Sequence, residues 1–553
     1  MAELTVEVRT AALAADAEPI IEQLVEQRVA SALASQDPTL WGPDACDEAA
    51  KRLSWVSLPE TSRPLLATIE ALRAQLHADG IDRVVLAGMG GSSLAPEVIC
   101  ATATIGNRSS RLTVLDTTDP GQVADALAGD LEHTVLVVSS KSGSTVETDS
   151  HRRIFTEAFT EAGLDPAAHL VAVTDPGSSL QRLAEEAGYR AVITADPNVG
   201  GRYSALSAFG LVPAGLAGAD IAALLDEATA VADALAADEA TNPALQLAAT
   251  LAAAHSRGAE KVAMADTGSG IVGFADWAEQ LIAESTGKQG TGLLPVVVEG
   301  PGAPGFHDAG PDTTTVAIGP ACDGADVAVA GTLGAQFLLW EHAVALAGRL
   351  LGINPFDQPD VEAAKSAARE LLDGGAADAG EPAFVDGAIA TYVLGDWLPA
   401  GTRTVTGALQ ALFTAVPEHG YLAVQAYLDR MVDASAAVLR AELTSRTGVQ
   451  TTFGWGPRYL HSTGQYHKGG HPNGAFLQLT GEVDDDIEVP GTPFTLGTLQ
   501  RAQALGDGRV LAAHGRPVLR LHFVERAAGL VALVRAVQQL GARQQPGRLE
   551  VRA

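Results

Sequence analysis

Short apolar runs alternate with amphipathic stretches of helical length along the first half of the chain. The runs are rich in β-branched residues, which predicts strands at five places. These are residues 83–87, 112–116, 134–138, 170–175 and 191–196. Strands that alternate with helices form a parallel sheet covered by helices on both faces. The pattern therefore predicts a doubly wound α/β domain with a five-stranded parallel sheet.

A second series of the same kind follows a stretch of Ala-rich helices. Its predicted strands are residues 261–266, 295–299 and 314–319. Residues before 61 show helical apolar spacing, and the segment at 371–383, rich in Gly, Ala and acidic residues, is typical of a boundary. We expect an N-terminal helical segment (1–60), two α/β domains (61–235 and 236–375) and a C-terminal α/β region (376–553).

One short sequence match connects the second domain with the C-terminal region. The segments TLGAQ at 332–336 and TLGTLQ at 495–500 each precede an apolar helical stretch. Matches of this length also arise by chance. Two interpretations therefore stay open: coincidence, or a C-terminal region that repeats part of the second domain.

The composition narrows the class of protein. With 47% hydrophobic residues the chain can bury several cores, and its formal charge of −31 argues against a nucleic-acid or anionic-membrane partner, since both need a basic face. The three cysteines match no metal-ligand spacing and favour a reducing cytoplasm. No secretory signal is visible at the N-terminus. The most apolar segment, 335–353, is interrupted by three charged or titratable residues, so we expect a buried helix there instead of a membrane span.

Hydroxyl and glycine residues gather where two predicted strands end. The first strand is followed by GMGGSS, which includes Gly91 and Ser92, and the third by SSKSGSTVET at 139–148. Free N–H groups and hydroxyls at the start of a helix bind anions. The alternative is a capping box formed by Ser144 and Glu147, which explains only two residues. We favour a phosphate cradle that also uses four others: Ser140, Lys141, Ser142 and Thr145.

Three later segments carry further candidate chemistry. Gly201 and Arg202 lie in VGGRYS, where the guanidinium offers a fixed charge. Gln280 and Glu284 lie four residues apart on one helical face. Gln358 and Lys365 are about two helical turns apart in a helix that we expect Pro359 to open. Taken singly, Arg202 is also compatible with a surface ion pair and Glu284 with an ordinary surface carboxylate.

These segments, in this order, resemble the glucose-6-phosphate isomerase family over roughly residues 80–370. The motifs that carry the resemblance are GGRYS, the Q-x-x-x-E pair and FDQPxVExxK. The family is built from two sugar-isomerase (SIS) domains, each a five-stranded parallel sheet flanked by helices. The chain is most similar to the bacterial branch and to the isomerase half of fused transaldolase–isomerase chains. No transaldolase portion is visible.

The resemblance implies a role for each candidate residue. The phosphate of a sugar phosphate would be held by Gly91, Ser92, Ser140, Lys141, Ser142 and Thr145. Glu284 would move a proton between C2 and C1 through a cis-enediol, and Arg202, next to Gly201, would stabilise the enediolate. Gln280 and Gln358 would orient sugar hydroxyls. Lys365 and a histidine would open the ring. The family's reaction needs no metal and no nucleotide cofactor.

The histidine departs from the family pattern. The bacterial branch has an LHSxGQ motif between the glutamate and FDQP, where this chain offers only His307 and His342. The segment YLHSTGQYHKGG occurs later, at 459–470, and we predict that His461 acts, with a surface turn as the alternative. In many relatives this histidine belongs to a partner subunit, so a homodimer is left open. Three other interpretations stay open: another SIS-domain phosphosugar isomerase, an isomerase that also accepts mannose 6-phosphate, and a non-catalytic sugar-phosphate sensor. A sensor would need neither Glu284 nor Lys365.

Overall fold

The first predicted sheet is confirmed in full. The computed structural model describes residues 4–104, 112–373 and 380–541. All five strands run parallel, in the order β3-β2-β4-β5-β6. They are β2 (Arg83–Gly88), β3 (Leu112–Leu115), β4 (Thr134–Ser139), β5 (Leu170–Thr174) and β6 (Ala191–Thr194). The helices of this unit are α5 (Pro64–Ala78), α6 (Leu94–Thr104), α7 (Pro120–Leu127), α8 (Val146–Glu161), α9 (Ser179–Glu186) and α10 (Ala208–Leu216).

The second sheet also has five strands, but one edge strand is antiparallel. Its order is β1-β10-β9-β7-β8, and β1 pairs antiparallel with β10. The strands are β1 (Thr5–Val8), β7 (Lys261–Asp266), β8 (Leu294–Val297), β9 (Thr313–Ile318) and β10 (Val327–Ala330). The expectation of a purely helical N-terminal segment is therefore wrong at β1. A four-residue edge strand with an exposed face has too little apolar pattern to be recognised.

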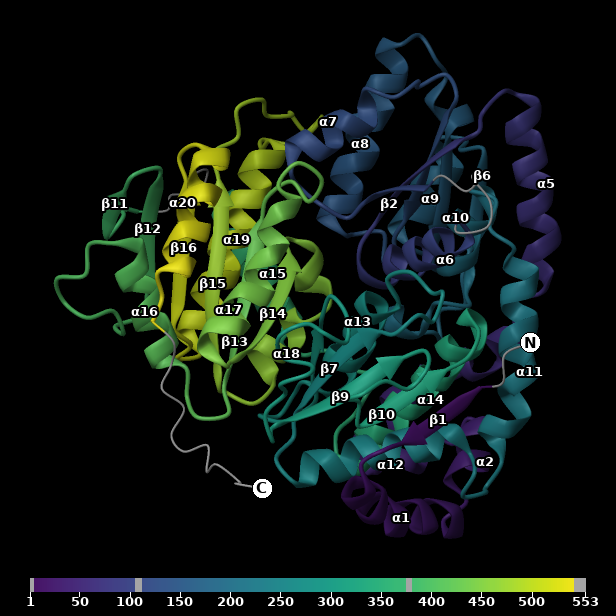
Figure 1. Cartoon of the computed structure of the whole chain (residues 1–553). Helices are drawn as coiled ribbons and strands as arrows, with labels where there is room; N and C mark the ends of the chain where they lie inside the picture. Colours follow the sequence, from purple (N-terminus) through teal and green to yellow (C-terminus); the bar gives the residue numbers. More distant parts are fainter. Residues whose placement is uncertain (1–3, 105–111, 374–379, 542–553) are drawn as a thin grey trace, which may run out of the picture.

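Helices from distant parts of the sequence cover the second sheet. They are α1 (Ala11–Glu26), α2 (Val29–Ala34), α3 (Pro43–Ala49), α4 (Leu58–Thr61), α11 (Ile221–Ala236), α12 (Pro243–Ser256), α13 (Phe274–Thr286) and α14 (Leu333–Leu350). The next helix, α15 (Val361–Asp373), packs instead against the C-terminal region. The apolar segment around α14 is a buried helix, as predicted. Among the described residues, no helix is long and apolar enough to cross a membrane. Figure 1 shows the first two sheets beside each other, and one continuous apolar core joins them.

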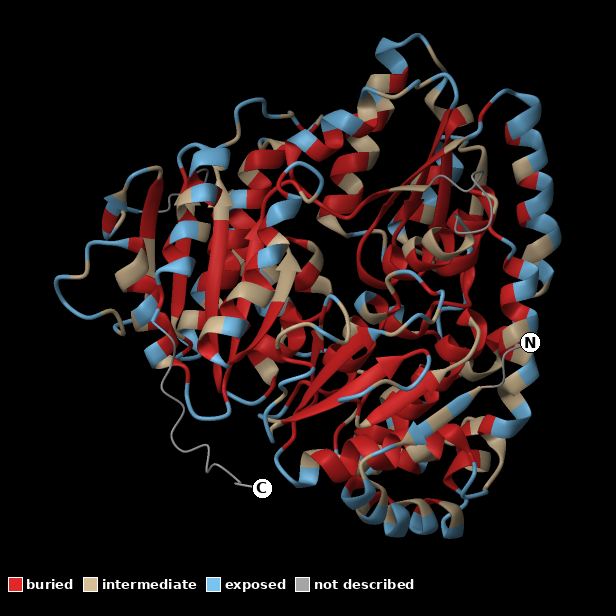
Figure 2. Cartoon of the chain, viewed as in Figure 1, coloured by how far each residue is buried: buried red, intermediate tan, exposed pale blue. Residues whose placement is uncertain are grey.

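The C-terminal region forms a third, six-stranded sheet in the order β11-β12-β16-β15-β13-β14. The strands are β11 (Phe384–Asp386), β12 (Ile389–Leu394), β13 (Tyr421–Tyr427), β14 (Gln450–Trp455), β15 (Gly474–Gly481) and β16 (Val518–Phe523). The helices are α16 (Val405–Ala415), α17 (Val438–Thr447), α18 (Gly464–Gly469), α19 (Leu496–Ala513) and α20 (Arg526–Gln538). The central strands of all three sheets are almost wholly buried (Figure 2), whereas the edge strands β1, β6 and β11 are partly exposed. Residues 374–379, within the expected boundary at 371–383, lie outside the described part.

The three sheets share one strand order. Numbered within each unit, the first four parallel strands follow the order 2-1-3-4 in all three sheets. Next to strand 4, the first sheet has a fifth parallel strand, whereas the second and third sheets have an antiparallel strand. The C-terminal region thus repeats the topology of the second domain. The TLG match is not the sign of this repeat, because α14 follows strand 4 of its sheet whereas α19 precedes strand 4 of the third sheet. His307 and His461 both lie between strands 2 and 3 of their units.

The core of the second unit contains one buried carboxyl group without a partner among the described residues, that of Glu341. It is fully buried in α14, and neither carboxyl oxygen has a hydrogen-bond partner among the described residues. Burial raises the pKa of this carboxyl well above its ordinary value of 4.5. In the unfolded chain the group ionises at its ordinary pKa, so rising pH favours unfolding until the folded-state pKa is passed. The native chain therefore loses stability between about pH 5 and pH 7 through this residue.

We predict that Glu341→Leu raises the free energy of unfolding by about 1–3 kcal/mol at pH 7, since an unpartnered polar group leaves the core. The gain should be smaller at pH 5. Urea unfolding at both pH values measures it, with Glu70→Leu on the exposed side of α5 as the control. A gain that is the same at both pH values would contradict the raised pKa.

Candidate active site

The hydroxyl-rich segment after β4 forms a compact turn at the start of α8. Ser140 Oγ accepts a hydrogen bond from the Gly143 N–H at 3.1 Å and lies 3.1 Å from Thr145 Oγ1. Ser142 Oγ lies 2.8 Å from Ser144 Oγ. The main-chain N–H groups of Lys141 and Ser142 have no hydrogen-bond acceptor among the described residues. The turn thus presents hydroxyls and N–H groups together at the N-terminus of a 16-residue helix.

The glycine-rich turn after β2 lies next to this segment. β2 and β4 are neighbouring parallel strands, with Gly88 opposite Ser139, so the segments that follow them leave the same edge of the sheet. Ser92 is buried in the short turn Gly90–Ser92. A Cβ on Gly91 would lie only 1.9 Å from the carbonyl oxygen of Gly201, so the two backbones can meet only because residue 91 is a glycine.

Lys141 departs from the expected cradle. Its ammonium forms an ion pair with Asp175, with an Nζ–Oδ2 distance of 2.6 Å, and donates a hydrogen bond to the Pro197 carbonyl oxygen at 3.1 Å. These partners follow β5 and β6. The ammonium of Lys141 therefore already has an anionic partner within the protein.

The capping-box interpretation of Ser144 and Glu147 is wrong. Thr145 is the N-cap residue of α8 and makes no side-chain cap. The Glu147 carboxylate is buried, where its Oε1 lies 3.2 Å from His461 Nε2 and accepts a hydrogen bond from Gln503 Nε2 at 2.7 Å. Burial raises the pKa of this carboxyl, but His461 and Lys365 outweigh it and lower the pKa on balance. Glu147 is thus an ionised partner that orients His461.

Glu284 is a buried carboxylate in the last turns of α13. Its exposed fraction is 8%, which excludes an ordinary surface position. Oε1 accepts a hydrogen bond from Gln280 Nε2 at 3.4 Å, and Oε2 accepts one from Arg202 Nη1 at 3.3 Å. Burial raises the pKa of Glu284, and the nearby Arg202 only partly opposes this. A carboxylate with a raised pKa is suited to accept and return a proton near neutral pH.

Arg202 connects three separate segments through its guanidinium. It is 4% exposed, so the alternative of a surface ion pair is wrong. Besides Glu284, it donates hydrogen bonds to Ser285 Oγ at 3.0 Å and to Gln358 Oε1 at 2.9 Å. Its Nη2 donates to the carbonyl oxygens of Pro355 and Asp357 at 2.5 and 3.0 Å. The guanidinium therefore fixes the end of α13 against the FDQP segment.

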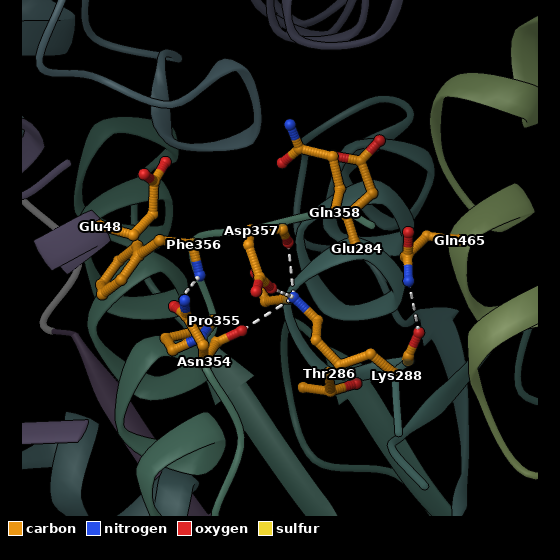
Figure 3. Close-up of polar contacts among 12 residues, drawn as sticks. Glu48, Glu284, Thr286, Lys288, Asn354, Pro355, Phe356, Asp357, Gln358 and Gln465 are labelled. Carbon is orange, nitrogen blue, oxygen red and sulfur yellow. Dashed lines mark hydrogen bonds and ion pairs between the residues drawn. The ribbon is translucent and has the colours of Figure 1, made fainter. Parts of the chain in front are cut away.

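The FDQP segment is not helical where we expected it to be. α15 begins at Val361, so Gln358 lies in the loop before it and does not share a helix face with Lys365. The residue before a proline disfavours the helical region, which explains the later start. Figure 3 shows Gln358 close to Glu284. In the same view Lys288 donates hydrogen bonds to the Asn354 carbonyl at 2.8 Å and to Asp357 Oδ1 at 2.8 Å, which anchors the loop.

His461 reaches this site from the C-terminal region of the same chain. A Cβ on Gly90 would lie 3.2 Å from the His461 carbonyl oxygen and 2.7 Å from Gln280 Nε2, so the three residues are neighbours. Gln465, from the same motif, donates hydrogen bonds to the Gly287 carbonyl at 2.9 Å and to Asp360 Oδ2 at 2.7 Å. The surface-turn alternative is therefore wrong for this loop. His307 is exposed, and its Nδ1 lies 2.9 Å from the Ala303 carbonyl.

One pocket of about 470 Å³ brings the hydroxyl turn, His461 and Lys365 together. Its lining includes Ser142, Ser144, Thr145, Glu147, Val361, Lys365, Leu460, His461, Phe494, Leu499 and Gln503. Gln280, Glu284 and Arg202 are buried next to it, beyond His461 and Gly90. No role was predicted from the sequence for Lys288, Gln465 or Gln503, and the predicted role of Glu147 as a helix cap is wrong. Only Gln465 had a signal, its place in the LHSTGQ motif.

Comparisons with known proteins agree with this geometry. The family model described as phosphoglucose isomerase matches residues 69–299. A glucose-6-phosphate isomerase of Acaryochloris marina is 30% identical over 387 residues, covering 57% of this chain and 72% of the relative. A probable glucose-6-phosphate isomerase of Methanococcus maripaludis is 28% identical over 367 residues, covering 56% and 83%.

Two solved structures share the fold. A hypothetical protein from Thermus thermophilus aligns with a TM-score of 0.55 and 24% identity, over 67% of this chain and all of that one. A glucose-6-phosphate isomerase from Chlamydia trachomatis aligns with a TM-score of 0.52 and 21% identity, over 66% of this chain and 86% of that one. With most of the Acaryochloris relative matched and the family's motifs assembled around one buried carboxylate, this chain belongs to the glucose-6-phosphate isomerase family.

Proposed function

We propose that this chain interconverts glucose 6-phosphate and fructose 6-phosphate by moving a proton between C2 and C1. The observation that carries the proposal is the Glu284 carboxylate, buried with a raised pKa between Arg202 and Gln280 and adjacent to His461. Proton transfer between neighbouring carbons requires such a base, together with a fixed cation where negative charge develops. The names of the relatives point to the same reaction.

The phosphate end of the sugar fits the hydroxyl turn. Ser140, Ser142 and Thr145 supply hydroxyls, and the helix start supplies N–H groups without protein acceptors. We assign Gly91, Ser92 and Gly201 to the neighbouring turn, where the backbones of Gly91 and Gly201 meet. We assign Lys141 a main-chain contact, because its ammonium is engaged by Asp175. The cradle would therefore bind the phosphate dianion although the protein as a whole carries a formal charge of −31.

Ring opening fits the residues at the pocket. His461 and Lys365 both line it, and Glu147 holds the imidazole in one orientation. One of these two groups donates a proton to the ring oxygen while the other accepts the proton of the C1 hydroxyl, which leaves the open aldehyde. Because His461 belongs to the same chain, the site requires no residue from a second copy.

Isomerisation then follows at Glu284. The carboxylate removes the C2 proton, the electron pair forms the C1–C2 double bond, and the former aldehyde oxygen becomes an enediolate oxygen. Arg202 stabilises this developing charge. The proton of the C2 hydroxyl moves to O1, and the Glu284 carboxylic acid returns its proton to C1 as the C2–O2 double bond forms, which gives the ketose. Gln280 Oε1 is buried without a partner among the described residues, which leaves it available for a sugar hydroxyl, and Gln358 lies beside Arg202 for the same purpose.

We predict that Glu284→Gln lowers kcat by about 10²–10⁴-fold, because the amide cannot accept the C2 proton. Binding of fructose 6-phosphate should persist, since the phosphate cradle is unchanged. A coupled assay with glucose 6-phosphate, fructose 6-phosphate and mannose 6-phosphate measures turnover, and calorimetry measures binding. Glu186→Gln, exposed at the end of α9, is the control. Retained turnover would remove Glu284 as the base, and no turnover of any hexose phosphate by the native chain would favour the sensor.

His461 and His307 offer a matched pair of variants. His461→Ala should slow isomerisation by about 10²-fold, since ring opening loses its proton carrier, while His307→Ala should leave the rate unchanged. Both rates come from the coupled assay at saturating substrate. Full activity in the His461 variant, or its loss in the His307 variant, would reverse the assignment.

The Arg202 charge also sets the pH dependence. Arg202 lowers the pKa of Glu284 and so opposes the effect of burial. In Arg202→Gln the carboxyl must be brought to a higher pH before it ionises, so the acidic limb of kcat/KM against pH should move to higher pH. The plateau should fall by about 10²–10³-fold, because the enediolate loses its cation. An unmoved limb would show that Arg202 does not control this carboxylate; Arg182→Gln, exposed on α9, is the control.

A further inference from the structure

The third sheet has one apolar face and one unusually polar face. On the first face, alternate residues of β12, β13, β15 and β16 are apolar and pack with residues of α16, α17 and α20. The opposite face carries Tyr392, Gln425, Tyr427, Gln478, Thr480, Arg520 and His522. A sheet face that only packs against a helix is normally apolar. Polar groups in such numbers indicate another use for this face.

The strand register places these polar residues in two rows. Tyr392, Arg520, Gln478 and Gln425 are direct neighbours across four strands. One pleat further along, His522 is the neighbour of Thr480, and Thr480 is the neighbour of Tyr427. The second row lies at the carboxyl ends of β13, β15 and β16, which are parallel. Ligands of open parallel sheets bind at these ends.

A pocket of about 240 Å³ opens at this place. Its floor includes Tyr427, Thr480, Arg520 and His522, and α19 contributes Gln500, Arg501, Ala504 and Leu505 to its wall. In the first sheet, the hydroxyl turn follows strand 3 of its unit. Here Thr480 and Gly481, at the end of strand 3 of the third unit, line the pocket. The pocket thus occupies, in the third unit, the position that the phosphate cradle occupies in the first.

Arg520 supplies a buried positive charge without a matching anion. It is 4% exposed, and its Nη1 has no hydrogen-bond partner among the described residues. The guanidinium lies over the Tyr392 ring, 4.7 Å from the centroid, a contact that does not neutralise it. Burial lowers the pKa of Arg520 to about 10, in keeping with a charge that nothing compensates. A buried arginine is normally paired, so this one is set up to receive an anion.

The second row adds groups that hold an oxyanion. His522 Nδ1 lies 3.0 Å from Thr480 Oγ1, and His522 Nε2 lies 3.2 Å from Glu482 Oε1 at the rim. Arg501 Nη2 lies 3.9 Å from Oε2 of the same glutamate. The pocket therefore presents a guanidinium, an imidazole and a hydroxyl. Among the described residues its one lining carboxylate is the exposed Glu482, which is paired with His522.

We propose that this pocket is a second binding site, separate from the active site, for a small molecule that carries a phosphate or carboxylate group. The group would pair with Arg520 and replace Glu482 as the acceptor of the His522 Nε2–H, while Thr480 holds the ring through Nδ1. The volume fits a compact metabolite of a few carbon atoms. The proposal does not depend on the isomerase activity, because none of these residues belongs to the active site.

Helix α19 places the two sites back to back. Its residues Leu499 and Gln503 line the catalytic pocket, whereas Gln500 and Ala504 line the second pocket. Gln503 donates the hydrogen bond that holds Glu147 beside His461. A ligand that shifts α19 would therefore change the position of Glu147, the partner of His461.

Calorimetric titration of the full chain tests the site with two probes, inorganic phosphate and malonate. We expect phosphate to bind at two sites, the cradle and the Arg520 pocket, and malonate to reveal whether a carboxylate suffices at the second. Arg520→Gln should weaken one phosphate site by about 10- to 100-fold, as loss of a charged hydrogen-bond donor does. Thr145→Ala should weaken only the other. Arg535→Gln, exposed on α20, should change neither.

A melting curve shows whether Arg520→Gln is folded; if it is not, His522→Gln at the same pocket takes its place. A single phosphate site that Thr145→Ala weakens and Arg520→Gln does not, with malonate unbound, would overturn the proposal. A site that depends on Arg520 would support it even if Glu284→Gln retained turnover, so failure of the isomerase assignment stays distinguishable.

Discussion

A single buried guanidinium holds the active site together. Arg202 donates hydrogen bonds to the catalytic carboxylate, to the neighbouring Ser285 and to three groups of the FDQP segment. A buried cation is costly when its hydrogen bonds are unsatisfied, so the position of each of these segments stabilises the others. The charge that we propose to stabilise the enediolate is thus the same charge that assembles the site. A substitution of Arg202 would therefore change both the position of these segments and the charge beside Glu284.

Lys288 extends this constraint to the loop that carries Gln358. It is almost fully buried, and burial lowers its pKa to about 8, with Arg202 acting in the same direction. Its ammonium is held by Asp357 and by the Asn354 carbonyl (Figure 3). Two cations therefore share one loop, and main-chain carbonyls provide most of their acceptors. The loop needs a defined backbone more than particular side chains.

Much of the fold and of the site follows from local pattern, and the failures have a common cause. Parallel strands buried on both faces are continuous apolar runs, so the five strands of the first sheet could be recognised. β1 could not, because a short edge strand carries little pattern. Glu147 looked like a helix cap because its spacing from Ser144 is local, whereas its true partners His461 and Gln503 are more than 300 residues away. Lys141 likewise has a partner, Asp175, that only the sheet brings near.

The repeated strand order explains why the histidine motif occurs so late in the chain. His307 and His461 lie in corresponding connections of the second and third units, and only the third unit directs its connection at the catalytic carboxylate. The residues that we propose as base, phosphate cradle and ring-opening histidine consequently belong to three separate units. Activity should then depend strongly on how the three units pack against one another. On gentle warming, slight separation of the third unit would abolish turnover while every sheet keeps its own core, so inactivation should precede the loss of secondary structure.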